Sequence, residues 1–507
     1  MPINAIPTEV LDAIFSHLND DLEGREYSLD YDYVRELCRA RLVCRRWSNI
    51  ARPRLFQTVT LKHRNVNAFN WNSGFTSTWT LKASGEGIDE EPTGQNLGKF
   101  SNWQCMLDNK AIRADARHAL IYSTPDNLYN DRDWFDWALW EKQGMYREFT
   151  DAIDLIGQLS NLRAVTLYFA RKCRGVENGN SSDDRVEKSS TRQHTLRAVL
   201  GAIQDQANNG ANASVVRSLT IRNLQNMPLP GITSSLLFKA ATKNITDLHL
   251  GIVQEYSWVH NVEVDIQRVE RREFEPYLHA QWLAPLADQL TSLTLYLDPL
   301  PWGLMPAYFS GQGLNFPHLR ELSLGNFAIG HDDHFDWVLR QKSLRRLWLD
   351  RCSVASLIHL NTDLLERWNV RTDDWVKIPA DTFGFDQPSD VLYRYLGTWE
   401  TLFDRIRCEL PHLIDFKFSS QYRARLRFRR PLNAYTDASS ITCRYVVIDC
   451  AHMRLFRPID DENGNVVLDI EGRWYQPHHQ VNRAEETLQG DERALKALLE
   501  AVSSQAR

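Results

Sequence analysis

A six-residue phrase recurs along the chain between residues 162 and 418. Each copy has apolar residues at its first, fourth and sixth positions, and the last two alternate around one polar or small residue. This alternation is typical of a short strand with one buried face, and such strands need neighbours to bury it. The copies are LRAVTL at 162–167, VRSLTI at 216–221, ITDLHL at 245–250, LTSLTL at 290–295, LRELSL at 319–324, LRRLWL at 344–349 and LIDFKF at 413–418.

Segments with helical spacing of apolar residues separate several of these phrases, for example residues 195–206 and 398–410. The alternation of strand and helix resembles a leucine-rich repeat, in which parallel strands line a concave face and helices or irregular segments form the back. Some steps between phrases fit the roughly 20 to 29 residues of such repeats, whereas those that begin at 162, 245 and 344 require insertions or degenerate repeats. A non-repeating α/β domain with several buried strands is the alternative.

The N-terminal residues predict a small helical unit. Leu11, Ile14, Phe15 and Leu18 stand at i, i+3, i+4 and i+7, which places them on one face of a helix. After a polar and acidic segment, residues 41–56 repeat the helical spacing. A module of about 55 residues cannot bury every apolar face internally, so a partner helix is expected to cover the remainder. The alternative is a pair of helices that cap a larger domain.

The phrases IPTEVLDAIFSHL at 6–18 and RLVCRRWSNIARPRLF at 41–56 resemble the F-box, a helical module that docks onto a Skp-type adaptor of cullin–RING ubiquitin ligases. The resemblance covers about a tenth of the chain, and an acidic segment near residues 19–33 lengthens the usual link between its halves. It implies a set of adaptor-binding residues from both halves of the module. These are Pro7, Glu9, Leu11, Ile14, Phe15, Leu18, Leu42, Val43, Cys44 and Trp47.

The fold class expected is an α+β or α/β solenoid, with a short three-helix F-box before an irregular leucine-rich-repeat-like domain of parallel strands and outer helices. We place the F-box at 1–60, a linker and capping region at 61–145, the repeat-like domain at 146–482 and a C-terminal helix at 483–507. Residues 491–502 predict that last helix because their leucines fall on one face.

Strand alternation turns the third and fifth positions of each phrase, and the residue that follows the phrase, toward the concave face. Trp348 flanked by Arg346 is the best hot-spot candidate there, because Trp and Arg dominate many interfaces. An ordinary solvated face is the alternative. A second target-binding candidate is a ladder of alternate arginines that would grip phosphate or carboxylate if residues 422–431 form a strand, unless the charges only protect an edge strand. The ladder consists of Arg423, Arg425, Arg427 and Arg429.

No motif for nucleotide binding, a nucleophile elbow or a zinc protease occurs in the sequence, so we expect no catalytic residue, cofactor or metal. HDDHFD at 331–336 has metal-capable side chains, but Asp332 or Asp333 is interpreted as the N-cap of a helix. The net charge of −6 gives no reason to expect nucleic acid or membrane binding, and no apolar run is long enough to span a bilayer. Eight scattered cysteines without a C-x-x-C pair favour reduced thiols in the cytoplasm or nucleus.

An F-box followed by leucine-rich repeats resembles the substrate receptors of Skp–cullin–F-box ligases, and the irregular, tryptophan-rich repeats look like fungal members. The resemblance implies a non-enzymatic subunit that holds the Skp-type adaptor, and through it the cullin–RING ligase, at its N-terminus. The repeats would recruit a protein target of unknown identity. A repeat scaffold without any ligase is the alternative, and an undetected enzyme comes third.

Overall fold

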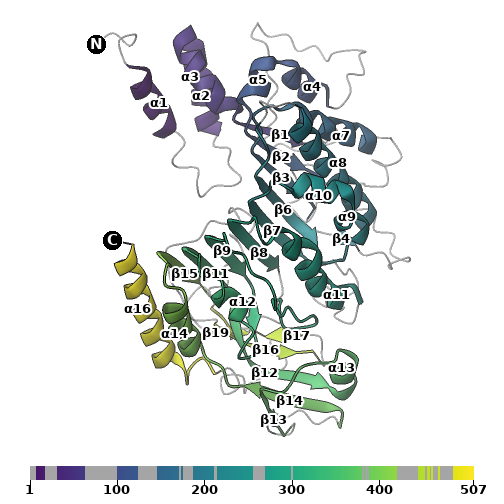
Figure 1. Cartoon of the computed structure of the whole chain (residues 1–507), viewed down its shortest axis with the longest axis vertical. Helices are drawn as coiled ribbons and strands as arrows, with labels where there is room; N and C mark the ends of the chain where they lie inside the picture. The colour runs from purple at the N-terminus through teal and green to yellow at the C-terminus, as the bar shows by residue number, and fades with distance from the viewer. Residues whose placement is uncertain are drawn as a thin grey trace. The chain divides into compact units, whose positions relative to one another are not determined.

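The computed structural model shows a mixed α/β fold with a large parallel sheet and a helical N-terminal region (Figure 1). The chain divides into two compact units, of which the second begins its main part at Ile245. The structure describes residues 7–17, 31–62, 100–123, 145–170, 173–174, 187–209, 214–254, 269–298, 301–379, 382, 388–419, 444–450, 454–456, 458–460, 466–468 and 483–506.

The first unit contains the N-terminal helices, four parallel strands and the helices between them. Its helices are α1 (Thr8–His17), α2 (Tyr31–Val43), α3 (Arg45–Phe56), α4 (Ser101–Asp108), α5 (Lys110–Asp115), α7 (Met145–Asp154), α8 (Ser189–Asn208) and α10 (Leu236–Thr242). Its strands are β1 (Thr58–Lys62), β2 (His118–Tyr122), β3 (Ala164–Tyr168) and β6 (Ser218–Gln225), which ends beyond the unit's boundary, with the short pair β4 (Cys173–Arg174) and β5 (Glu187–Lys188).

The strands of the first unit pair in the order β1-β2-β3-β6, parallel and in register. One row across the sheet shows why this register is stable: Ala119, Val165 and Leu219 are all 1% exposed or less. The long helix α8 also buries apolar side chains, among them Leu196 and Leu200. The residues between these apolar positions therefore lie on the opposite face of the sheet.

The second unit repeats this arrangement with the parallel order β7-β8-β9-β11-β15. Its corresponding core row is Leu248, Leu293, Leu322 and Leu347, each 1% exposed or less. The strands are β7 (Asp247–Val253), β8 (Ser292–Asp298), β9 (Glu321–Gly325), β11 (Arg346–Asp350) and β15 (Asp415–Ser419). The helical segments between them are α11 (Val269–Tyr277), the π-helical turn η4 (Leu278–Leu283), the 3-10 turn η5 (Ala284–Leu286), α12 (Asp336–Leu339) and α14 (Trp399–Glu409).

A second sheet follows β11, in the order β13-β14-β12-β16-β17, and it mixes parallel and antiparallel pairs. β12 is its central strand and is buried on both faces; its sequence SVASLIHLN mixes apolar residues with buried serine and histidine and lacks the 1-4-6 phrase. Its elements are β12 (Ser353–Asn361), β13 (Trp375–Ile378), β14 (Asp390–Tyr395), β16 (Tyr445–Asp449) and β17 (Arg454–Phe456), with β10 (Ala328–Ile329) beside β12 and α13 (Thr362–Arg367) after it.

The C-terminal helix α16 (Leu488–Gln505) is fastened by a buried carboxylate. Asp491 pairs with Arg444 across 2.6 Å, and both side chains are 2% exposed or less. The hydroxyl of Thr487 also donates to Asp491 over 2.8 Å, and the backbone N–H of Glu400 in α14 donates to it over 2.7 Å. This carboxylate therefore links α16 to α14 and to the residue that precedes β16.

Every recurrent phrase predicted as a strand forms one, with the strand beginning two residues into the phrase. Two differences concern the segments between them. Residues 58–62, which begin in the range assigned to the F-box, and residues 118–122, within the linker and capping region of 61–145, are strands of the parallel sheet that the recurrent phrase did not predict. The long step after 344 contains the mixed second sheet, which departs from the expected pattern of parallel strands and outer helices.

Candidate docking surface and recognition face

The N-terminal helices form a small core of their own. Phe15 of α1 and Trp47 of α3 meet edge to face with their ring centroids 5.4 Å apart. The same cluster also contains Leu37, Ala40, Ile50, Ala51 and Leu55. Arg54 of α3 pairs with Asp12 of α1 across 2.8 Å. Apolar contact and this ion pair together hold α1 against α3.

The structure divides the predicted adaptor-binding residues into two groups. Leu11 is 1% exposed and Phe15 is 2% exposed, so they stabilise the module from inside, with Trp47 half-buried beside them. Others are exposed apolar side chains: Ile14 is 46% exposed, Leu42 is 79% exposed and Val43 is 56% exposed.

The remaining residues of that set are polar, small or outside the described part. Pro7 and Glu9 are exposed at the start of α1, and Cys44 is the half-buried N-cap of α3. Leu18 lies outside the described residues, as does most of the acidic segment near 19–33. Sequence reasoning missed Val10, which is 46% exposed one turn before Ile14; its i−4 spacing is the signal that could have found it.

The open face of the second unit carries charges that are paired within the chain. The Trp348 indole N–H donates to Asp415 over 3.1 Å, and the Lys417 ammonium lies 4.9 Å from the Trp348 ring centroid. Arg346 pairs with Glu321 across 2.7 Å. The predicted pair Arg346 and Trp348 therefore does lie on one face, with Trp348 half-buried and Arg346 exposed. The other target-binding candidates, Arg423, Arg425, Arg427 and Arg429, lie outside the described residues.

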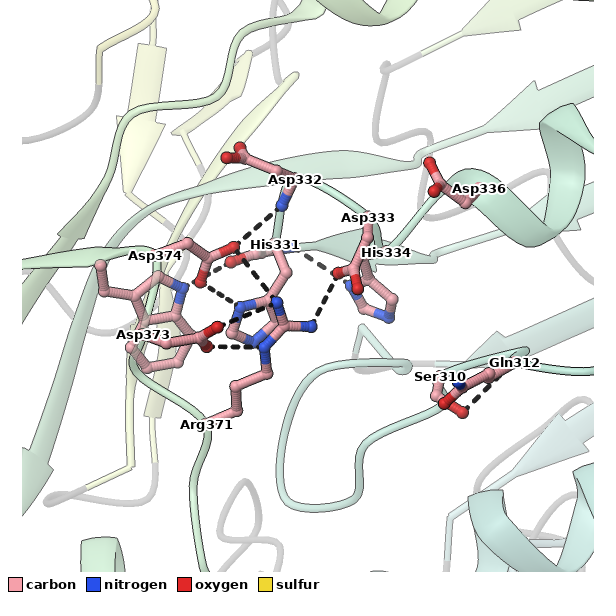
Figure 2. Close-up of polar contacts among 12 residues, drawn as sticks. Ser310, Gln312, His331, Asp332, Asp333, His334, Asp336, Arg371, Asp373 and Asp374 are labelled. Carbon is pink, nitrogen blue, oxygen red and sulfur yellow. Dashed lines mark hydrogen bonds and ion pairs between the residues drawn. The ribbon is translucent and has the colours of Figure 1, made fainter.

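A charged cluster stands where the HDDHFD segment meets the start of β13. Figure 2 shows the Arg371 guanidinium between Asp333, to which it donates over 2.7 Å, and Asp373, to which it donates over 2.6 Å. His331 Nδ1 lies 2.5 Å from Asp374. Hydrogen bonds from Arg371 lower the pKa of the Asp373 carboxyl, whereas burial lowers the pKa of His331.

His331, Asp373 and Asp374 place possible metal-ligating atoms within 4.8 Å of one another. The same carboxylates already have internal partners, so a divalent cation would have to compete with Arg371. The cluster ties the segment before α12 to the segment before β13. The N-cap expected at Asp332 or Asp333 was wrong, because α12 begins at Asp336 with Phe335 as its N-cap.

No helix in the described part of the chain has the length and apolar character needed to cross a bilayer. Among curated proteins, none matches the chain. A comparison with family models finds a match at the N-terminus, over the helices whose core and exposed apolar residues are described above. F-box domains generally bind Skp-type adaptors. Residues 3–62 match the F-box-like family, and the chain therefore carries an F-box-like domain at this position.

Proposed function

We propose that this protein is the substrate-recognition subunit of a Skp–cullin–F-box ubiquitin ligase. The observation that carries the proposal is the F-box-like domain at residues 3–62 together with the apolar side chains that its helices leave exposed. The domain docks on the Skp-type adaptor, and through it the chain joins a cullin–RING ligase in the cytoplasm or nucleus.

The exposed apolar residues support docking because their burial releases free energy. Leu42 and Val43 end α2, and Ile14 lies on α1. Full burial of an aliphatic side chain contributes roughly 1.5–3 kcal/mol. Three such residues in a partner's groove would together contribute roughly 4.5–9 kcal/mol before the cost of association is subtracted, so they would anchor an interface that other contacts complete.

The parallel strands would form the surface that binds the target, as in the fungal-type leucine-rich-repeat receptors that the sequence resembles. Support comes from the repeated 1-4-6 phrase and the in-register pairing of its strands. The chain itself would perform no bond chemistry. It would hold a target lysine near a ubiquitin-loaded enzyme, which is catalysis by proximity.

Capture of a purified Skp-type adaptor by the immobilised full chain tests the docking. Leu42→Glu combined with Ile14→Glu should lower the affinity at least a hundredfold, because each change buries a charge in an apolar contact. Both side chains are exposed, so the thermal unfolding midpoint should change little. The matched control is Leu236→Glu, since Leu236 is 83% exposed at the start of α10, outside the N-terminal helices.

Two outcomes contradict the proposal. One is the absence of any association between the folded full chain and the adaptor. The other is equal capture of the wild type and the double variant. Either result would favour an interaction scaffold that works without a ligase.

A further inference from the structure

A buried imidazole distinguishes the charged cluster before α12 and β13 from an ordinary group of surface acids. His331 is 2% exposed, and its ring stacks on the Trp375 indole with the centroids 4.9 Å apart and 9° between the planes. Tyr308 meets the same ring edge to face, with the centroids 5.4 Å apart. Packing therefore holds the imidazole independently of the acidic residues, with Nδ1 directed at Asp374 (Figure 2).

Two carboxylates complete a set of possible ligand atoms. His331, Asp373 and Asp374 each offer one atom, and these atoms all lie within 4.8 Å of one another. The Asp374 carboxylate is anchored, because it is 15% exposed and accepts the backbone N–H of Asp332 over 3.0 Å. The Asp373 side chain is 66% exposed and free to rotate. Ligand atoms 2.0–2.2 Å from a tetrahedral ion lie about 3.3–3.6 Å apart, so a small rotation of Asp373 would close the set.

The cluster holds more negative charge than its arginine balances. The Arg371 guanidinium lies within 4.0 Å of three carboxylates, those of Asp333, Asp373 and Asp374. Burial lowers the pKa of His331, so at about pH 7 the ring is neutral and adds no positive charge. One positive charge therefore faces three negative ones. A divalent cation in place of the guanidinium would balance them better.

We propose that His331, Asp373 and Asp374 form a zinc site in which the metal takes the place of the Arg371 guanidinium. One imidazole and two carboxylates suit Zn²⁺, which binds both nitrogen and oxygen, whereas Mg²⁺ and Ca²⁺ prefer oxygen ligands alone. Three protein ligands leave the fourth tetrahedral position to water. The Arg371 side chain is 35% exposed, so it can turn toward solvent when the ion enters.

A bound ion would fasten two segments of the second unit that are distant in sequence. His331 follows β10 and Asp374 precedes β13, and the two residues are 43 positions apart. Both strands belong to the sheet centred on β12, so the ion would hold two of its connections together. The inference goes beyond the proposed function, because it needs neither the F-box-like domain nor an adaptor.

Isothermal titration of the purified full chain with zinc chloride, after a chelator has removed metal, tests the site. Asp373→Asn should weaken zinc binding about a hundredfold, because changes to residues that only support a ligand already cost about 10–100-fold. Arg371→Gln should strengthen it about tenfold, since the competing cation is gone. A circular dichroism spectrum and a metal-free unfolding midpoint equal to wild type establish that each variant is folded.

The matched control is Asp333→Asn. The Asp333 side chain is 56% exposed and accepts from the same guanidinium over 2.7 Å, but it does not belong to the set of ligand atoms described above. Its removal takes the same charge from the cluster and should weaken zinc binding less than about threefold. Equal losses for Asp333→Asn and Asp373→Asn overturn the proposal, because the cluster would then attract cations by charge alone. Zinc binding by Arg371→Gln that is no tighter than wild type also overturns it.

Cobalt(II) in place of zinc identifies the type of ligand. A site of one nitrogen and several oxygens should give visible absorption bands without the sulfur-to-metal charge-transfer band that a cysteine ligand produces. That charge-transfer band, or zinc binding that Asp373→Asn leaves unchanged, would place the metal elsewhere and overturn the proposal. Displacement of zinc by an equal concentration of Mg²⁺ would contradict it too. Adaptor capture should be the same for the wild type and Asp373→Asn, so the metal and adaptor measurements fail independently of one another.

Discussion

The open strand faces of the two units differ in charge: the described strands β1, β2, β3 and β6 of the first contain no carboxylate, whereas strands of the second carry several that are paired within the chain. Arg117, Arg163 and Arg217 stand exposed on strands that carry no carboxylate. In the second unit the same position holds two threonines, two arginines and an isoleucine, and the adjoining face is acidic as well as basic.

Four carboxylates on that face of the second unit have a partner in the chain. Glu321 pairs with Arg346, Asp415 accepts the Trp348 N–H, Asp350 accepts the Tyr296 hydroxyl over 2.9 Å, and Asp247 accepts the Thr291 hydroxyl over 3.0 Å. One type of strand pairing thus supports two electrostatic arrangements. Removing one partner of a charge pair within the chain should therefore lower the free energy of unfolding, by more where the pair is buried.

The largest effect on stability should come from a fully buried arginine–aspartate pair of the second unit. Asp491→Asn leaves the Arg444 guanidinium buried without its counter-charge. Loss of one partner of a buried ion pair costs about 3–5 kcal/mol. We expect that decrease in the free energy of unfolding by urea denaturation, together with proteolytic release of α16.

The control for this change is Asp404→Asn, which breaks an exposed pair with Arg407 within α14. Exposed pairs three residues apart on a helix contribute less than about 0.5 kcal/mol. If both variants lose the same small amount of unfolding free energy, the buried pair does not stabilise the second unit. The comparison between the two faces would then not rest on internal pairing.

A pH-dependent effect of intermediate size should come from His334. Its side chain is fully buried, and burial, together with the neighbouring His331, lowers its pKa to about 3. Nδ1 accepts the Gly330 N–H over 3.3 Å while Nε2 lies 3.0 Å from the Phe309 carbonyl, so the neutral ring satisfies both partners. A proton on Nδ1 would remove the acceptor that Gly330 needs.

The unfolded state therefore binds the proton more readily than the folded state between about pH 6.5 and pH 3. The contribution of His334 is complete above pH 6.5 and falls by about 1.4 kcal/mol per pH unit below it. His334→Gln retains a donor and an acceptor without titrating. By pH 4.5 its loss of unfolding free energy relative to neutral pH should be smaller than that of wild type by about 2–3 kcal/mol, measured by urea denaturation across pH. Parallel curves for the two proteins would show that His334 does not cause acid sensitivity.

The sequence predicted the parallel strands because the apolar positions of the phrase are the positions that the sheet buries. Leu219 and Leu347 are completely buried and both occupy the fourth position. The sequence did not predict strand β2, because ARHALI at 116–121 has alanines at the first and fourth positions of the phrase. The pattern is present there, but with smaller and less hydrophobic side chains. Strand β12 was not predicted for a different reason: it is buried on both faces, so apolar and polar residues do not alternate along it.

Side-chain roles were less predictable than strands. Helical spacing places Leu11, Ile14 and Phe15 together, but only the packing of α1 against α3 decides that Ile14 remains exposed while the other two are buried. The alignment of Arg117, Arg163 and Arg217 at neighbouring strand starts is determined by the register between strands that are about 50 residues apart in sequence. Periodicity within one segment contains no information about that alignment.

The smallest predicted effect is also the most direct test of the two faces. A double-mutant cycle with Glu321→Gln and Arg346→Gln should give a coupling of about 0.2–1 kcal/mol, because both side chains remain nearly half exposed, at 43% and 48%. Arg163→Gln in the first unit should leave the free energy of unfolding unchanged within about 0.5 kcal/mol. Urea denaturation at low salt measures both, and added salt should reduce the coupling. A loss above about 1 kcal/mol for Arg163→Gln would mean that this exposed charge is used within the chain, and the difference between the two faces would then not be one of internal pairing.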